Sequence, residues 1–131
     1  METRKVALIV FYDGSKRILL QDRNGIAKHG EGWGFFGGGI EKGETPKEAV
    51  VRETKEELSI DLKNYKFIGR VKGVLADKYI FISKLGDISK LKQNEGRAMK
   101  LFTIKKARKL KMGPEDSHAL DLFEKVIFRR R

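Results

Sequence analysis

The stretch FFGGGIEKGETPKEAVVRETKEELSID, residues 35–61, joins a glycine-rich segment to a strongly acidic one. It holds seven acidic side chains, counting its last residue, Asp61, although the whole chain of 131 residues carries a formal net charge of +11. Like charges at helical spacing destabilise an isolated helix. Such a cluster therefore needs either screening by solvent or a bound cation, and both explanations are open at this point.

A helix is predicted from the capping pattern within this stretch. Thr45 suits the N-cap, Pro46 the first helical position and Glu48 the third, which completes a capping box. We expect the helix to run to about Leu58, with Ser59 near its end. At roughly 100° per residue, one arc of this helix carries Glu53, Glu56 and Glu57. A neighbouring arc, expected to face the core, carries Val50, Val51, Thr54 and Leu58.

Carboxylate oxygens are hard ligands that suit Mg²⁺ or Mn²⁺, which often also hold substrate phosphates. The glycines before the helix, Gly37 to Gly39, would let the backbone approach a ligand closely. Gly43 and Glu44 lie just before the helix N-terminus, where a phosphate is readily bound. A solvated acidic face and a simple tight turn are the competing interpretations of the same residues.

Strand patterns surround this region. Alternating or continuous apolar residues predict strands within 5–14, 16–23, 65–74, 77–85 and 97–104, the first two joined by a turn at Asp13 and Gly14. Residues 24–39 are predicted to be a glycine-rich connection without regular structure throughout. The basic segment 105–113 has some helical character, and a final amphipathic helix is predicted over 114–128. We therefore expect a single domain, residues 1–131, with a mixed α/β (α+β) sandwich in which a sheet lies between helices.

The spacing Gly38-x5-Glu44-x7-Arg52-Glu53-Thr54-x-Glu56-Glu57-Leu58-Ser59-Ile60 resembles the Nudix box, G-x5-E-x7-R-E-U-x-E-E-x-G-U. Two positions depart from it. Thr54 replaces an apolar residue and should soften the packing, and Ser59 replaces a glycine and should shift the following turn. The strand order and closing helix resemble the small MutT-type Nudix hydrolases. Residues 33–38 resemble their W-x-x-P-G-G segment, with Phe36 in place of proline, which predicts a less rigid loop.

The resemblance implies roles for the matching positions. Metal ligands would be Glu53, Glu56, Glu57 and the Gly37 carbonyl, holding Mg²⁺, for which Mn²⁺ could substitute. Glu44 would support the site or contact a second metal through water, and Arg52 would orient Glu53 and tie the loop to the helix. A water molecule would attack phosphorus, with either Glu53 or Glu95 as the base.

Substrate contacts are implied less directly. The residues expected to contact substrate are Gly38 in the loop, and Arg23 and Lys28, which resemble positions that hold phosphate or base. Asp116, preceded by Glu115 and followed by Ser117, resembles an arrangement that contacts the purine edge, although acids are also favourable in the first turn of any helix. Tyr79 and Phe81 alternate along a predicted strand, where one of them could stack on the base or both could pack in the core.

The implied activity is hydrolysis of a nucleoside diphosphate-linked substrate. A purine nucleoside triphosphate, normal or oxidised, would yield the monophosphate and pyrophosphate. RNA 5′ ends are the main alternative, because the basic residues 105–111 and 129–131 could hold a nucleic acid. Dinucleoside polyphosphates are a third substrate class. A nucleotide- or RNA-binding module without activity is the alternative from a different functional class.

Composition bounds these interpretations. The sequence has no cysteine, which excludes disulfides, thiolate catalysis and cysteine-based zinc sites. Its apolar runs are too short for a signal-peptide core or a membrane span. We therefore expect a cytoplasmic protein without membrane attachment, present as a monomer or a homodimer.

Overall fold

One mixed sheet forms the centre of the computed structural model, which describes residues 3–23, 32–74, 76–86, 91 and 98–129. Within these residues, the sheet has seven strands. They are β1 (Arg4–Tyr12), β2 (Ile18–Asp22), β3 (Trp33–Gly34), β4 (Phe36–Gly39), β5 (Lys66–Lys72), β6 (Ala76–Lys84) and β7 (Met99–Phe102). The strand order is β3-β2-β1-β6-β5, with β4 paired to β1 and β7 paired to β2. The pair β1–β6 is parallel, whereas β1 runs antiparallel to β2 and β4.

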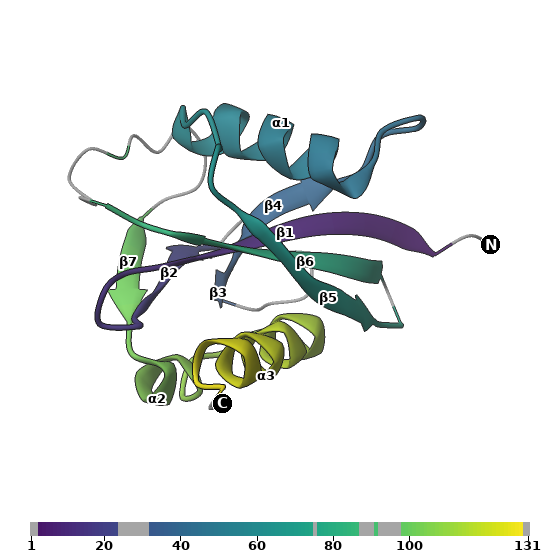
Figure 1. Ribbon diagram of the computed structural model, residues 1–131. Coiled ribbons are helices and arrows are strands. Elements are labelled where there is room, and N and C mark those ends of the chain that lie inside the picture. The colour runs from purple at the N-terminus through teal and green to yellow at the C-terminus, as the bar shows by residue number, and fades with distance from the viewer. Residues whose placement is uncertain (1–2, 24–31, 75, 87–90, 92–97, 130–131) are drawn as a thin grey trace.

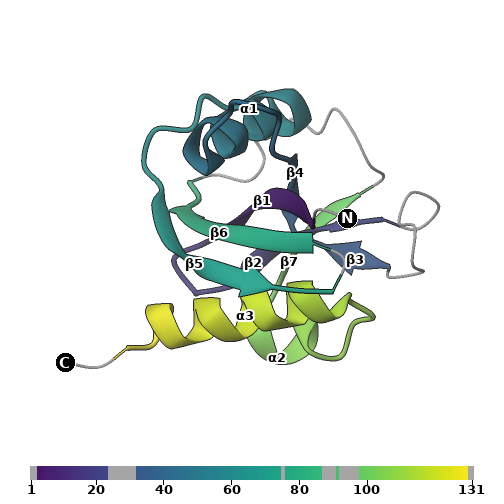
Figure 2. The same ribbon diagram turned by 90° about the vertical axis from the view of Figure 1, so that its right-hand side faces the viewer.

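Helices cover both faces of this sheet (Figures 1 and 2). Helix α1 (Pro46–Leu58) lies on one face, and α2 (Ile104–Ala107) and α3 (Pro114–Ile127) lie on the other. The predicted α/β sandwich is therefore confirmed, as are both long helices to within one residue of their expected ends. None of the helices among the described residues is long and apolar enough to cross a membrane.

Strand β1 supplies both hydrophobic cores, because its side chains alternate between the two faces of the sheet. Val6, Leu8 and Val10 pack on the α3 side, and Ala7, Ile9 and Phe11 pack on the α1 side. All six are buried. A continuous apolar strand at the centre of a covered sheet fixes both helical layers, and it gives β4 a rigid partner.

The described part of the glycine-rich connection, residues 32–39, is more regular than the sequence predicts. Residues 33–34 and 36–39 form β3 and β4, and Phe36 to Gly39 pair with β1 along its length. Glycine is a poor strand former on its own, so the sequence pattern did not predict β4. Backbone pairing with the buried strand β1 holds this strand in place. Phe36 is fully buried, so side-chain packing anchors this position where the resemblance predicted a looser loop.

Helix α1 has a side-chain cap at its N-terminus and a left-handed residue at its C-terminus. The Thr45 hydroxyl accepts from the Glu48 backbone N–H, and the Glu48 carboxylate accepts from the Thr45 N–H, so the predicted capping box is present. Ser59 adopts the left-handed conformation at φ 57° while its N–H donates to the Lys55 carbonyl. Ser59 therefore ends the helix in the conformation that glycine would take more easily.

Thr54 places a polar hydroxyl group in the core, in addition to changing the packing. Its side chain is 1% exposed, and its hydroxyl has no hydrogen-bond partner among the described residues. A buried hydroxyl without a partner costs about 1–3 kcal/mol. Threonine in place of an apolar residue therefore leaves a buried polar atom without a hydrogen bond among the described residues, besides any effect on packing.

Candidate active site

Arg52 joins the loop after β4 to the acidic side of α1. Its guanidinium donates to both carboxylate oxygens of Glu44, at 2.8 Å from Nε and 2.9 Å from Nη2. Nη1 donates to Glu53 Oε1 at 2.9 Å, and Nη2 donates to the Gly39 carbonyl at 3.0 Å. Longer contacts of 3.4 Å reach both oxygens of Glu56. One side chain thus sets the relative positions of three glutamates and the loop backbone.

These hydrogen bonds also fix the charge states. Hydrogen bonds from Arg52, followed by one from the Glu41 backbone N–H, lower the pKa of Glu44 to about 2. Hydrogen bonds to Glu44, the largest cause, and to Glu53 raise the pKa of Arg52. Glu44 is therefore ionised, and Arg52 positively charged, throughout the neutral pH range.

The loop glycines lie directly against two of the helix carboxylates. The Gly37 N–H donates to Glu57 Oε1 at 2.9 Å, and Glu57 is buried. Gly37 has φ +140°, and a β-carbon there would lie 2.1 Å from the Ala7 carbonyl oxygen on β1. A β-carbon on Gly38 would lie 2.5 Å from the Glu53 carboxylate. Glycine at 37 is thus required by the pairing of β4 with β1, and glycine at 38 leaves room for the Glu53 carboxylate in its present position.

The donors gathered here fit a hard divalent cation. Glu44, Glu53 and Glu56 contact one guanidinium, and Glu57 contacts the Gly37 amide, so negative charge remains in excess, and all these side-chain ligand atoms are oxygens. Within the described part of the chain, no group of three acidic or histidine side chains is already arranged to hold a metal ion. Binding would require these carboxylates to reorient from their present contacts with Arg52 and the Gly37 amide.

A second polar cluster lies at the start of α3. Asp116 is 7% exposed, and its Oδ1 accepts from Lys78 Nζ on β6 at 3.4 Å. Gly34 separates Asp116 from Arg23: a β-carbon on Gly34 would lie 3.4 Å from Asp116 Oδ2 and 2.9 Å from Arg23 Cδ. Arg23 Nε is buried and has no hydrogen-bond partner among the described residues. The structure therefore brings together the predicted residues Arg23 and Asp116.

Lys78 is a member of this cluster that the sequence did not identify. The alternation within β6 points it to the α3 side, since its neighbours Tyr79 and Phe81 belong to the α1 side. That alternation was the available signal, but nothing in the sequence linked Lys78 to a residue 38 positions away. The same alternation separates both aromatic side chains from Asp116, and Phe81 is 1% exposed in the core.

The two clusters lie close together along the chain. Gly34 contacts the Arg23–Asp116 cluster, and Gly37 contacts the carboxylate cluster three residues later. Three extended residues span at most about 10 Å, so a single small molecule could touch both. Lys28 and Glu95, two further predicted site residues, lie outside the described residues. For Glu115 only the backbone is described.

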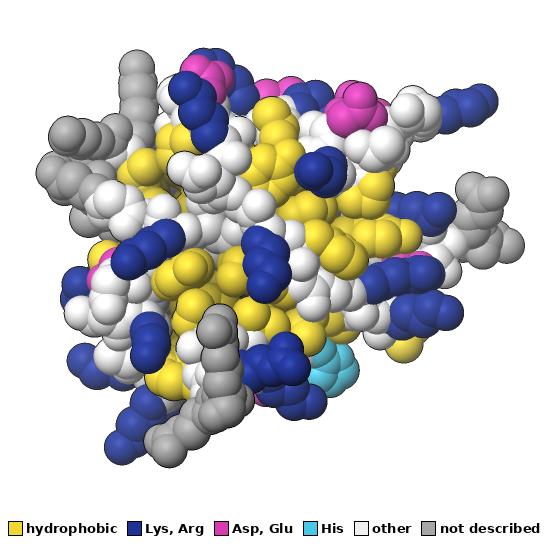
Figure 3. Space-filling model, in the orientation of Figure 1, with side chains coloured by type: hydrophobic (Ala, Val, Ile, Leu, Met, Phe, Trp, Pro, Cys, Tyr) yellow, Lys and Arg dark blue, Asp and Glu magenta, His cyan; other side chains and the backbone are white. Residues whose placement is uncertain are grey.

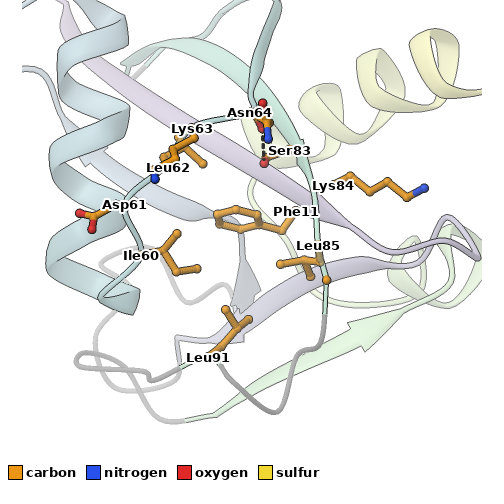
Figure 4. A pocket seen from close by; sticks show the side chains of 11 residues that line it. Phe11, Ile60, Asp61, Leu62, Lys63, Asn64, Ser83, Lys84, Leu85 and Leu91 are labelled. Atoms are coloured by element: carbon orange, nitrogen blue, oxygen red, sulfur yellow. Dashed lines mark hydrogen bonds between the residues drawn. The ribbon is translucent and has the colours of Figure 1, made fainter.

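The cavity in Figure 4 lies elsewhere, beyond the C-terminal end of α1. It measures about 250 Å³ and lies between the segment after α1 and the ends of β1 and β6. Ser83 borders it and donates to the Asn64 carbonyl at 2.6 Å. The residues that line it include none of the predicted site residues, so the cavity has no part in the candidate site.

Comparisons with known proteins agree with this arrangement. A sequence model of the NUDIX domain matches residues 2–123. The 8-oxo-dGTP diphosphatase of Proteus vulgaris is 31% identical over 78 residues, which cover 60% of this chain and 70% of that protein. The RNA pyrophosphohydrolase of Marinomonas sp. (strain MWYL1) is 46% identical over 43 residues, which cover 33% of this chain and 27% of that protein.

Among solved structures, the solution structure of the E. coli ORF135 protein is similar, with a TM-score of 0.76. The likeness covers 99% of this chain and 94% of that chain at 22% sequence identity. At this identity the likeness shows that the two chains share a fold.

Proposed function

Because the chain belongs to the NUDIX domain family of pyrophosphohydrolases, we propose that it hydrolyses a purine nucleoside triphosphate, normal or oxidised, to the monophosphate and pyrophosphate. One water molecule is consumed, and the anhydride bond between the α- and β-phosphates breaks. Attack on either of these two phosphorus atoms gives the same products. A cytoplasmic location suits this proposal, because free nucleotides are found there.

The observation that carries the proposal is the linkage of Glu44, Arg52 and Glu53 to the glycines of β4. In the proposal, Glu53, Glu56, Glu57 and the Gly37 carbonyl hold Mg²⁺, and Glu44 supports them. When bound, Mg²⁺ neutralises charge on the phosphoryl oxygens and lowers the pKa of the attacking water. Glu53 or Glu95 accepts the proton of that water, and Arg52 acts as a positioning residue by fixing the Glu53 carboxylate.

Recognition of the nucleoside is assigned to the cluster at the start of α3. The Asp116 carboxylate can accept hydrogen bonds from the N–H groups of a guanine-type base. Lys78 holds it in place, and Arg23 supplies a buried N–H that has no partner among the described residues. Gly38 and Lys28 complete the proposed substrate contacts. The similarity to the Proteus vulgaris protein named 8-oxo-dGTP diphosphatase supports a purine.

The test is a panel of substrates with Mg²⁺ and then Mn²⁺. It contains normal and 8-oxo nucleoside triphosphates, diadenosine polyphosphates and 5′-triphosphate RNA, with phosphate and pyrophosphate measured separately. Glu57→Gln is the test variant. Glu48→Gln is its control in the same helix, because glutamine also completes a capping box. We expect pyrophosphate release from one purine triphosphate that is lost in Glu57→Gln and kept in Glu48→Gln.

Direct Mn²⁺ binding tests the ligand assignment, and thermal unfolding of both variants separates metal loss from misfolding. Electron paramagnetic resonance of free Mn²⁺ should show weaker binding to Glu57→Gln than to Glu48→Gln. Equal Mn²⁺ binding by both variants would contradict the ligand assignment. Unchanged turnover in Glu57→Gln would contradict the proposed site as a whole.

RNA 5′ ends are the second candidate substrate. The similarity to an RNA pyrophosphohydrolase favours them, as do the exposed lysines of the predicted basic segment, Lys105, Lys106, Lys109 and Lys111. Arg108 in that segment contributes less, because it forms ion pairs with Asp121 and Glu124. Pyrophosphate release from the 5′-triphosphate RNA alone, absent with every free nucleotide, would favour this candidate over the first.

A further inference from the structure

Four aromatic rings form a continuous series on the α1 side of β5 and β6. Ring centroids are 6.0 Å apart between Tyr65 and Phe81, 5.3 Å between Phe81 and Phe67, and 6.4 Å between Phe67 and Tyr79. A cation lies at each end of the series. Lys47 Nζ is 5.8 Å from the Tyr65 ring, and the Arg70 guanidinium is 5.6 Å from the Tyr79 ring. We name these four rings and two cations the β5–β6 aromatic face.

Part of this face is open to solvent. Helix α1 packs mainly on β1 and β4, which leaves part of the same side of β5 and β6 uncovered. Phe67 is 48% exposed, Tyr65 and Tyr79 are half-buried, and Phe81 forms the buried floor. Figure 3 shows an exposed band of hydrophobic side chains in the region of β5 and β6, between α1 and α3, with Lys and Arg around it.

The charge of this face is positive. Besides Lys47 and Arg70, the exposed residues Lys5 and Lys72 lie on the same side of the sheet, each in register with Asp77. Asp77 is buried and forms an ion pair with Arg70. This pairing offsets the charge of Arg70, so the excess positive charge of the face comes from Lys47, Lys5 and Lys72.

We propose that the β5–β6 aromatic face binds single-stranded nucleic acid. Exposed rings between cations stack on successive bases while the cations contact the phosphates, largely without regard to sequence. The net charge of +11 attracts such a polymer. A second copy of the chain would bring two positive faces together, which like-charge repulsion disfavours.

This face is separate from the candidate active site. Lys47 and Glu56 are nine residues apart on α1, which places them about 180° apart around the helix. Tyr79 likewise points away from Lys78 and Asp116. The proposal concerns binding without hydrolysis, so it does not depend on the proposed function.

The test uses a fluorescent oligouridylate of about 12 nucleotides with a 5′-hydroxyl group, which has no anhydride to cleave. Fluorescence anisotropy gives its affinity for the intact protein at low salt. We expect Phe67→Ala to weaken binding on the order of tenfold, the usual effect of losing one stacked base. Phe128→Ala is the matched control, since Phe128 is 49% exposed and has Lys16 Nζ 4.8 Å from its ring. It should bind as the unchanged protein does.

Salt dependence tests the electrostatic part. Each phosphate contact contributes about 0.7 to the slope of log affinity against log salt for single strands. Lys47→Gln should therefore lower the slope by about that amount, and Lys16→Gln should leave it unchanged. Thermal unfolding and nucleotide hydrolysis of Phe67→Ala, measured alongside, should match the unchanged protein and show that the fold and the active site are intact.

Three results would overturn the proposal. The first is no binding of the oligonucleotide at low salt, and the second is an equal loss of affinity in Phe67→Ala and Phe128→Ala. The third is a dimer in sedimentation that Phe67→Ala dissociates while RNA affinity stays the same, which would identify a second copy as the partner. None of these results depends on whether nucleoside triphosphates are hydrolysed.

Discussion

Gly38 lies so close to Glu53 that a β-carbon on residue 38 would stand 2.5 Å from the carboxylate carbon of Glu53. The same carboxylate accepts a hydrogen bond from Arg52 at 2.9 Å. The Glu53 carboxylate therefore lies between the backbone of β4 at Gly38 and the Arg52 side chain of α1. Displacing a catalytic group by about 1 Å can cost about 100-fold in rate.

We predict from this contact that Gly38→Ala lowers kcat for the best substrate about 100-fold and leaves the thermal unfolding temperature little changed. The matched control is Gly39→Ala, because a β-carbon there meets only the end of the Arg4 side chain, at 3.4 Å. Steady-state kinetics of the two variants checks the prediction. Full activity in Gly38→Ala would mean that Glu53 can move without loss of function.

The pH dependence of stability should report the Glu44–Arg52 pair. The pKa of Glu44 is about 2 in the folded protein, against an ordinary value of 4.5, so the pair stabilises the fold above pH 4.5. This stabilisation is lost as the pH falls from 4.5 through 2, because the carboxylate becomes protonated. The difference in free energy of unfolding between the unchanged protein and Glu44→Gln should shrink over this window.

Urea denaturation at a series of pH values measures that difference. Carboxyl chemical shifts in NMR give a direct check: Glu44 should titrate near pH 2, and in Arg52→Gln it should move toward its ordinary range. A Glu44 that titrates near 4.5 in the unchanged protein would show that the ion pair is weaker in solution than the geometry indicates.

The unpartnered hydroxyl of Thr54 predicts a stabilising substitution. Thr54→Val keeps the shape of the buried side chain and removes a polar atom that lacks a partner among the described residues, so it should raise the free energy of unfolding by about 1 kcal/mol. Thr45→Val should do the opposite and cost about 1 kcal/mol, because Thr45 caps α1. Urea denaturation at pH 7 compares the two. A destabilised Thr54→Val would indicate a partner for the hydroxyl in solution.

Asp116 should control the choice of base. Asp116→Asn replaces one acceptor oxygen by an N–H donor, so kcat/KM for the preferred purine triphosphate should fall on the order of tenfold, the value of one charge-assisted hydrogen bond. Pyrimidine triphosphates should be affected less. Asp121→Asn is the control on the same helix, since Asp121 pairs with Arg108 at 2.7 Å on the surface. Equal losses for all bases would assign Asp116 a structural role.

The acidic helix could be predicted almost completely, because its determinants are local. Thr45, Pro46 and Glu48 fix its start within one turn, and the glutamate spacing places three carboxylates on one side of it. The strands of the central sheet were also accessible through their apolar runs. Strand β4 was not, because its glycines carry no side-chain pattern and gain their structure from backbone pairing with β1.

Long-range contacts set the limit of prediction at the candidate site. Arg23 and Asp116 could be proposed separately, but their meeting across Gly34 depends on how α3 packs against the sheet. Lys78 joins them through a pairing over 38 residues. The same holds for Phe67 and Tyr79, whose contact arises from the register of β5 and β6.

The pairing of β4 with β1 has a further consequence for how the protein loses activity on heating. Gly37, which binds Glu57, is hydrogen-bonded into the same sheet as the most buried strand of the molecule. Local fraying cannot release such a residue without breaking the cooperative unit around it. The carboxylate cluster and the sheet therefore share one melting event, and the heat resistance of the catalyst equals that of the whole domain.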